Sequence, residues 1–115
     1  MTGEEFLRMV LALRAQRDAP ALPGLLDGFG LQPHVGKRFG EMSLGTRKKF
    51  MIATGLASDA QVVLMDEPTN GIDANAKACL VERMREGREA RLFFFSTHDR
   101  EAVVQSNARV FALPA

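Results

Sequence analysis

The sequence has a single cysteine, Cys79, and lacks any stretch that would act as a signal peptide or a membrane anchor. One cysteine cannot form an internal disulfide, and it fits a reducing compartment. Near the amino terminus, Glu4, Glu5 and Arg8 interrupt the apolar run that a signal peptide needs. No run reaches the roughly 18 uncharged apolar residues of a membrane helix. We therefore expect any role at a membrane to depend on a partner protein.

The chain also lacks a strong charge of either sign. Its formal net charge is +1, so charge gives no argument for binding nucleic acid, and no nucleic-acid partner is expected. Its 115 residues are enough for one small domain but not for two. A chain of this length can bury well over half of its unfolded surface, so a modest core is expected.

The first third of the chain is predicted to be helical. Residues 2–16 have apolar side chains at helical spacing, and Thr2 followed by Glu5 is typical of a capping box. A short second helix is predicted to begin at Pro23. Residues 31–42 contain one proline and two glycines and are predicted to form a loop.

Part of this loop superficially matches the phosphate-binding pattern G-x-x-x-x-G-K-[ST]. Gly30 and the pair Gly36-Lys37 are one residue too far apart, Arg38 stands where serine or threonine is needed, and no strand precedes the pattern. The structural context that would give the pattern its meaning is therefore missing. We reject a phosphate-binding loop at this place.

A helix is predicted from Ser43 to about Ala57. Ser43 is a good N-cap, and Gly45 allows another backbone to come close. The first turn is basic, with Arg47, Lys48 and Lys49, which is unfavourable beside the positive end of a helix dipole. This turn indicates that anions bind at the helix terminus, although an ordinary capped helix with a basic first turn is the simpler interpretation.

A buried strand is predicted to end in two adjacent carboxylates. Residues 62–65 are apolar, Asp66 and Glu67 follow them, and Pro68 stops the strand. In an open α/β sheet, ligands bind at the carboxyl ends of the strands. Neighbouring carboxylates repel each other unless a cation or a proton relieves them. The pattern predicts a metal–phosphate site, and the alternative is a strand followed by an acidic turn.

A helix over residues 74–87, with Asp73 as its N-cap, is predicted next. Its expected inner face comprises Ala78, Val81 and Met84, with Cys79 and Leu80 toward the flanks.

The remaining elements give an alternation of strands and helices. They are a strand over 91–96, a helix over about 99–106 and a third strand from Arg109 to Leu113. The strand over 91–96 is apolar on both faces and is expected to lie centrally in a parallel sheet. The order strand–helix–strand–helix–strand predicts an α/β fold with parallel pairing.

Polar residues are expected to converge at one edge of this sheet. Asp66 and Glu67 follow one strand, His98 follows the next, and Asp73 lies between them. A lone histidine after a strand is more often structural, but a glutamate and a histidine after successive parallel strands form a stronger pattern. Two acids and an imidazole around one point suit metal-assisted attack of water on a phosphate.

Four segments together resemble the ATP-binding cassette (ABC) ATPases. Residues 43–46 are similar to the signature loop of that family, and residues 62–67 to its Walker B strand with the catalytic glutamate. Residues 70–73 are similar to its D-loop, and residues 96–99 to its switch histidine. The four segments occur in the family's order, and each alone is a weaker signal than the set.

The resemblance implies a partial P-loop NTPase fold that spans residues 1–115 as one partial nucleotide-binding domain. Residues 1–41 would form a helical subdomain. Residues 42–115 would carry the signature helix, the Walker B strand, the D-loop and the switch-histidine region, built as strand–helix–strand–helix–strand around a parallel sheet.

The resemblance also assigns a role to each matching residue. Asp66 would hold Mg²⁺, through water, and Glu67 would act as general base or orient the attacking water. His98 would contact the γ-phosphate. The signature residues Ser43, Leu44, Gly45 and Thr46 would contact a nucleotide bound on the opposite subunit. Asp73 would lie at the dimer interface and couple the two sites.

Some features depart from the family pattern. Leu44 replaces the first of two signature glycines, and Thr46 replaces the usual glutamine. Some bacterial export-type subunits look similar at this loop. The sequence also contains no Walker A loop and no Q-loop, so the chain is expected to be a carboxyl-proximal part of a nucleotide-binding domain and to be inactive alone.

The function that the resemblance implies is ATP hydrolysis coupled to transmembrane transport, in the export direction. ATP and Mg²⁺ would be the cofactors, and a second nucleotide-binding domain and a transmembrane permease the partners. The subunit would be cytoplasmic and peripheral at the inner face of the membrane. Two alternatives remain open: a non-catalytic partner that completes another subunit's ATP site in trans, and a soluble ABC ATPase that acts on DNA or ribosomes.

Overall fold

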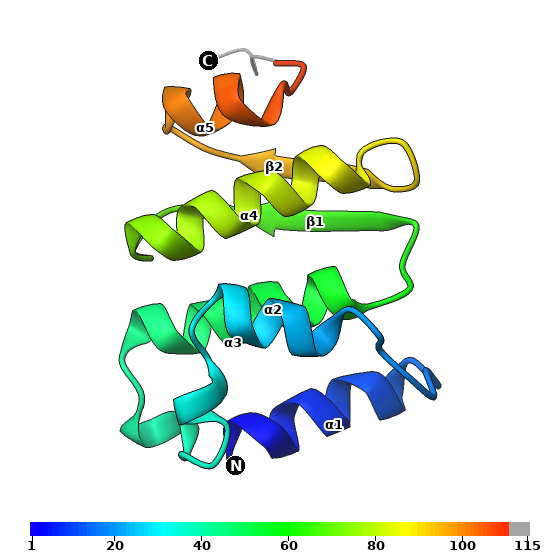
Figure 1. The fold of residues 1–115 in the computed structure, drawn as a ribbon, viewed down its shortest axis with the longest axis vertical. Helices are drawn as coiled ribbons and strands as arrows, with labels where there is room; N and C mark the ends of the chain where they lie inside the picture. The colour runs from blue at the N-terminus through cyan, green and yellow to red at the C-terminus, as the bar shows by residue number, and fades with distance from the viewer. Residues whose placement is uncertain (111–115) are drawn as a thin grey trace.

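The computed structural model describes residues 1–110, in which helices and a small parallel sheet alternate (Figure 1). The helices are α1 (Gly3–Leu13), α2 (Leu22–Gly28), α3 (Leu44–Ala57), α4 (Ala74–Gly87) and α5 (Arg100–Ser106), with short 3-10 turns η1 (Gln32–His34) and η2 (Phe39–Glu41). The strands are β1 (Val62–Asp66) and β2 (Leu92–Ser96). This order confirms the α/β class predicted from the sequence. No helix among the described residues combines the length and apolar content needed to cross a membrane.

Side-chain caps at Thr2 and Ser43 fix the starts of α1 and α3, as the sequence predicted. At α1, the Glu5 N–H donates to Thr2 Oγ1 and the Thr2 N–H donates to Glu5 Oε1, both over 3.1 Å, which completes the capping box. At α3, the Thr46 N–H donates to Ser43 Oγ over 3.1 Å. These bonds satisfy backbone donors that have no partner within the helix.

The two strands are parallel, as the order of the elements predicted. Val62 pairs with Leu92, and Asp66 pairs with Ser96 at the carboxyl end. Both arrows in Figure 1 point the same way, so the loops after the two strands leave from one edge of the sheet. This arrangement brings the residues after β1 close to those after β2.

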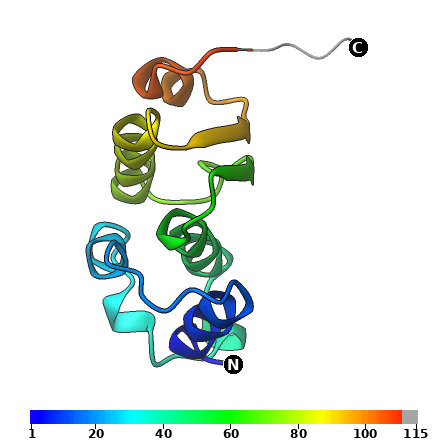
Figure 2. The ribbon, with the colours of Figure 1, turned by 90° about the vertical axis from the view of Figure 1, so that its right-hand side faces the viewer.

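Helices cover only one face of the sheet in the described chain (Figure 2). On the other face Leu64 is 75% exposed and Phe94 is 50% exposed. The central position predicted for β2 is therefore wrong for residues 1–110, where β2 pairs with β1 alone. Of the third strand predicted from Arg109 to Leu113, residues 109 and 110 are not in a strand, and residues 111–113 lie outside the described part.

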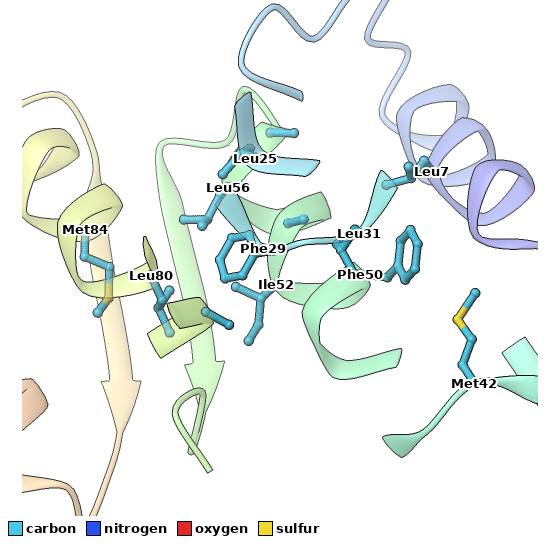
Figure 3. Packing of buried hydrophobic residues seen from close by; sticks show 13 residues of the cluster. Leu7, Leu25, Phe29, Leu31, Met42, Phe50, Ile52, Leu56, Leu80 and Met84 are labelled. Atoms are coloured by element: carbon cyan, nitrogen blue, oxygen red, sulfur yellow. The ribbon is translucent and has the colours of Figure 1, made fainter. Parts of the chain in front are cut away.

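One apolar cluster joins the helical half of the chain to α4 (Figure 3). Phe29, Leu31 and Phe50 are almost fully buried at its centre. On α4, Leu80 is fully buried and Ala78 is exposed, so the predicted inner face was wrong at these two positions. The reason is that α4 packs against α2 as well as the sheet, and Gly28 and Cys79 meet so closely that a Cβ on Gly28 would lie 2.6 Å from Cys79 Sγ.

The carboxyl-terminal end of α3 is tied to the start of β2. The guanidinium of Arg91 donates to the carbonyls of Leu56 and Gly55 over 2.9 and 3.0 Å, and it stacks on the ring of Phe93 with its centre 5.4 Å from the ring centroid. A cation at this end is favourable because the last carbonyls of a helix carry partial negative charge. The contact fixes α3 relative to the sheet.

Candidate functional site

The site begins with an unusual backbone turn after β1. Glu67 has φ of +46°, a left-handed conformation that non-glycine residues adopt only at a cost. Its N–H donates to the carbonyl of Ser96 over 3.0 Å, and the Asn70 N–H closes the turn on the Glu67 carbonyl over 3.1 Å. Pro68 and Thr69 are buried inside the turn. These contacts compensate for the strained conformation and direct the Glu67 side chain toward the edge of the sheet.

Ser96 links the two carboxylate residues. Its hydroxyl accepts a hydrogen bond from the Glu67 N–H over 3.0 Å and donates one to Asp66 Oδ1. A serine hydroxyl has one proton to donate, so these two bonds assign its orientation. The chain from Glu67 through Ser96 to Asp66 fixes the position of the Asp66 carboxylate.

His98 lies beside Glu67, as the sequence predicted. Its Nε2 atom is 3.4 Å from Glu67 Oε1, and the imidazole is 98% exposed whereas the Glu67 side chain is 31% exposed. Glu67 is therefore partly sheltered while His98 projects from the surface. Asp66, Glu67 and His98 thus lie at the same edge of the sheet.

Asp99 holds the loop that carries His98. Its side chain accepts from the Ala102 N–H over 3.1 Å and so caps α5, and it also forms an ion pair with Lys77 of α4. The hydrogen bond from Lys77, followed by that from the Ala102 N–H, lowers the pKa of the Asp99 carboxyl below its usual value. Asp99 therefore connects α5, α4 and the His98 loop.

We expect the ion pair between Asp99 and Lys77 to make the free energy of unfolding depend on pH in the acidic range. Because the pKa of Asp99 is lowered by folding, its contribution to stability is complete above its ordinary pKa of 3.8 and is lost as the pH falls through the lower folded value. Denaturant unfolding of Asp99→Asn at a series of acidic pH values should show a shallower loss of stability than the wild type. The double variant Asp99→Asn/Lys77→Met should match Asp99→Asn. Lys77→Met should lie between Asp99→Asn and the wild type, because the Ala102 N–H still lowers the pKa of Asp99 in that variant. A slope in Lys77→Met equal to that of the wild type would contradict the pairing.

A second group of predicted residues lines a hollow of about 210 Å³ between α3 and the loop before α4. Lining residues are Ser43, Gly45, Thr46, Lys49, Gly71, Ile72 and Asp73. A larger hollow of about 330 Å³ beside Phe6 and Leu64 is mostly apolar and contains none of the predicted site residues. The smaller hollow is therefore the one that joins the predicted signature residues to Asp73.

Asp73 is held at this hollow by two contacts. Its carboxylate accepts from the Ala76 N–H over 2.8 Å, which caps α4, and lies 2.9 Å from Lys49 Nζ. The Ala76 N–H, and then the Lys49 ammonium, lower the pKa of the Asp73 carboxyl. Asp73 therefore stays ionised at neutral pH and joins the start of α4 to α3.

The expected signature residues are presented differently from one another. Leu44 is 77% exposed at the start of α3. Ser43 Oγ accepts from the Thr46 N–H and donates to Thr46 Oγ1 over 2.9 Å. The hydroxyls of Ser43 and Thr46 are thus occupied with each other, and a ligand that takes a hydrogen bond from Ser43 must replace Thr46 as its acceptor.

Two of the three cations in the first turn of α3 bind groups of the chain itself. Lys48 Nζ donates to the carbonyls of Glu67 and Asn70, and Lys49 pairs with Asp73. These two ammonium groups bind the chain's own loop, which offsets the unfavourable interaction with the helix dipole and agrees with the simpler interpretation of a capped helix with a basic first turn.

The carboxylates fit Mg²⁺ only with help from water and phosphate oxygens. Among residues 1–110 no three or more histidine, cysteine or carboxylate side chains are grouped to hold a metal. Mg²⁺ in proteins commonly keeps several waters and uses one or two carboxylates together with substrate phosphates. Asp66 is exposed and already oriented by Ser96, so its donor set suits this mode.

Two residues of the site were given no individual role by the sequence interpretation. Ser96 orients Asp66, and Lys48 holds the Glu67 turn. The one sequence signal for Lys48 was its unfavourable place in the first turn of a helix, which indicates a tertiary partner. Nothing in the local pattern around Ser96 distinguishes it from an ordinary end of a strand.

A protein-family model matches more than half of the chain. Residues 36–104 match the model described as "AAA domain, putative AbiEii toxin, Type IV TA system". The chain is 35% identical over 88 residues to the zinc transport system ATP-binding protein AdcC of Streptococcus pneumoniae, covering 75% of this chain and 38% of that relative. It is 36% identical over 107 residues to the ABC transporter ATP-binding protein NatA of Bacillus subtilis, covering 90% and 44%.

A solved structure agrees with these relatives. The structure described as an ATP-binding subunit of an ABC transporter superposes with a TM-score of 0.82 at 29% identity, covering 90% of this chain and 45% of that one. The chain spans less than half the length of each of these three proteins.

Proposed function

Because the chain belongs to the ATP-binding cassette ATPases, we propose that its residues form part of an ATP-binding subunit that hydrolyses Mg-ATP to drive transmembrane transport. The observation that carries this proposal is the meeting of two carboxylates and an imidazole at one edge of the sheet. Glu67 Oε1 lies 3.4 Å from His98 Nε2, and Asp66 is oriented beside them by Ser96.

In this mechanism each residue has one task. Glu67 orients a water molecule and accepts its proton as the water attacks the γ-phosphorus of ATP, while the bond from that phosphorus to the bridging oxygen breaks and ADP leaves. His98 donates a hydrogen bond to a γ-phosphate oxygen, where negative charge must be stabilised. Asp66 would hold Mg²⁺ through a water molecule. Mg²⁺, when bound, would neutralise phosphate charge.

The hollow beside α3 supports a shared, two-subunit site. Ser43, Leu44, Gly45 and Thr46 would face a nucleotide held by a second nucleotide-binding domain, and Asp73 would lie at the interface between the two. The amino-terminal N–H groups of α3 and the positive end of its dipole suit a phosphate group there. Residues 1–115 contain no lysine-bearing phosphate loop, so we propose that this stretch by itself does not hydrolyse ATP.

The remaining parts of the proposal concern the cellular setting. The motif segments would correspond to the signature, Walker B, D-loop and switch-histidine regions of one partial nucleotide-binding domain, with residues 1–41 as its helical subdomain. A transmembrane permease would be the partner, which places the subunit in the cytoplasm at the inner face of the membrane. Leu44 and Thr46 favour export, since some export-type subunits look similar at this loop.

The test uses the protein in its natural form. A tag added to the chromosomal gene would allow the protein to be isolated from detergent-solubilised membranes together with its associated chains, and release of phosphate from Mg-ATP would be measured. We expect hydrolysis in the wild type and a loss of roughly 100-fold in His98→Ala, because a donor to the transferring phosphate is removed.

The matched control is His34→Ala, which removes an imidazole from the loop at η1. That variant should hydrolyse ATP at the wild-type rate. Absence of hydrolysis in the wild type with its associated chains present would contradict the proposed catalytic function and favour a non-catalytic partner. Recovery of the protein without a membrane protein would contradict the transport assignment.

A further inference from the structure

Lys48 of α3 contacts the backbone of the turn at residues 67–73, which carries Glu67. Its Nζ atom donates to the Glu67 carbonyl and, over 2.6 Å, to the Asn70 carbonyl. The residue is half-buried, and an ammonium group has three donors, so it can bind two carbonyls at once. Hydrogen bonds from a charged donor are stronger than those between neutral groups.

Lys48 binds the carbonyl of Glu67, the residue with the strained left-handed backbone. Glu67 adopts its left-handed conformation between β1 and the turn that the Asn70 N–H closes. Such a conformation persists only where surrounding contacts over-determine it. Ser96 of β2 binds the N–H side of Glu67, and Lys48 of α3 binds the carbonyl side. The two contacts hold the residue from opposite directions.

Lys48 lies one turn beyond the residues expected to face a nucleotide on a second subunit. In the same region a Cβ added to Gly45 would lie 2.7 Å from the Gly71 carbonyl oxygen, and Lys49 pairs with Asp73. The start of α3 is therefore fixed to the 67–73 turn at three points. A shift of α3 would be transmitted to the Glu67 backbone through the Lys48 ammonium.

The geometry points to Lys48 as a positioning residue. From α3, the helix that also bears Ser43 and Gly45, its ammonium group fixes the backbone of Glu67 and thereby the position of the Glu67 carboxylate. This inference rests on the proposed function, because it assigns Lys48 a part in the hydrolysis that Glu67 performs. Lys48 touches neither the nucleotide nor the attacking water. It acts on the rate by keeping Glu67 within reach of them.

The first measurement separates turnover from binding. In the natural protein, Lys48→Met keeps the length of the side chain but removes its donors. We expect kcat to fall by roughly 10- to 100-fold, because an error of about 1 Å in a catalytic group costs up to that much. KM for Mg-ATP should stay within about twofold of the wild type if binding is separate from this placement. Lys48→Arg, which retains donors at similar reach, should recover part of kcat.

The second measurement needs no hydrolysis. Hydrogen exchange would be followed in the peptide that covers residues 65–73. We expect the amides of Glu67 and Asn70 to exchange faster in Lys48→Met and the rest of α3 to be unchanged. Lys37→Met, which removes an exposed ammonium from the loop after η1, should match the wild type in rate and in exchange.

The outcomes distinguish this inference from the proposed function. If the wild type hydrolyses ATP but Lys48→Met has wild-type kcat and exchange, the inference is wrong and the proposed function stands. If kcat falls together with faster exchange throughout the chain, Lys48 has only a general structural role, and the inference is also wrong. If the wild type does not hydrolyse ATP, the proposed function fails, and unchanged exchange in the 65–73 peptide would refute the Lys48 contact as well.

Discussion

Replacing Glu67 with glutamine is expected to reduce ATP hydrolysis by roughly 100- to 10,000-fold, the range that a positioned general base contributes. Glutamine has almost the same shape but cannot accept the proton of the attacking water. The backbone contacts of the residue run through its N–H and carbonyl to Ser96 and Lys48, so they remain possible in the variant. Phosphate release by the natural protein, isolated with its associated chains, gives the rate.

The glutamine variant should still bind nucleotide. Filter binding of labelled ATP would separate lost chemistry from lost affinity. Glu82→Gln, which makes the same chemical change at an exposed position on α4, should leave both measurements at wild-type values. A rate in Glu67→Gln within tenfold of the wild type would assign proton transfer to another group.

The edge on which this prediction depends could be located from the sequence alone. Two short apolar runs, each followed by polar residues and separated by a helix with a clear cap at Asp73, are enough to predict parallel strands with their loops at one edge. The structure places β1 and β2 in parallel and brings His98 to Glu67. Periodicity and caps are local signals, and they were sufficient here because the topology follows from the order of elements.

The rotation of α4 could not be predicted in the same way. The apolar residues Ala78, Leu80, Val81 and Met84 allow more than one inner face, and the choice depends on which neighbours the helix meets. Because α4 packs against α2 and α5 in addition to the sheet, Leu80 is buried and Ala78 faces solvent. The face that such a helix buries is determined by all of its neighbours together, and the sequence of the helix alone does not identify them.

The contacts that hold the site were also hidden from the sequence. The left-handed conformation of Glu67 depends on Ser96, which is 29 residues away, and on Lys48, which is 19 residues away. Long-range partners of this kind leave no periodic pattern. The basic turn of α3 is the one local sign, and its purpose follows only from the position of the 67–73 turn.

The second large effect is expected at Gly45, where two opposing contributions can be compared. Alanine is favoured over glycine inside a helix by about 1 kcal/mol, so Gly45→Ala would stabilise α3 if the helix were isolated. In the folded protein the new Cβ would lie 2.7 Å from the Gly71 carbonyl oxygen, whereas ordinary contacts begin at 3.4 Å. Forcing extra volume into a packed contact costs about 1 to 3 kcal/mol.

The cost is expected to exceed the gain, because neither side of the contact can yield easily. Gly71 has φ of +79°, a left-handed backbone conformation that residues other than glycine rarely adopt. Displacing it would carry along Asp73, the cap of α4 and partner of Lys49. We therefore expect Gly45→Ala to lower stability by up to about 2 kcal/mol and to reduce ATP hydrolysis by roughly 100-fold, because the helix and the turn both move.

Thermal unfolding and phosphate release on the same preparation measure the two effects. Gly36→Ala is the matched control, since a Cβ at Gly36 would meet no atom within 4 Å. It should leave the rate unchanged and the stability equal or slightly higher, because alanine restricts the unfolded chain more than glycine does. If Gly45→Ala has wild-type stability and rate, α3 and the 67–73 turn can move apart without consequence. That result would contradict a role for the contact between Gly45 and Gly71 in the site.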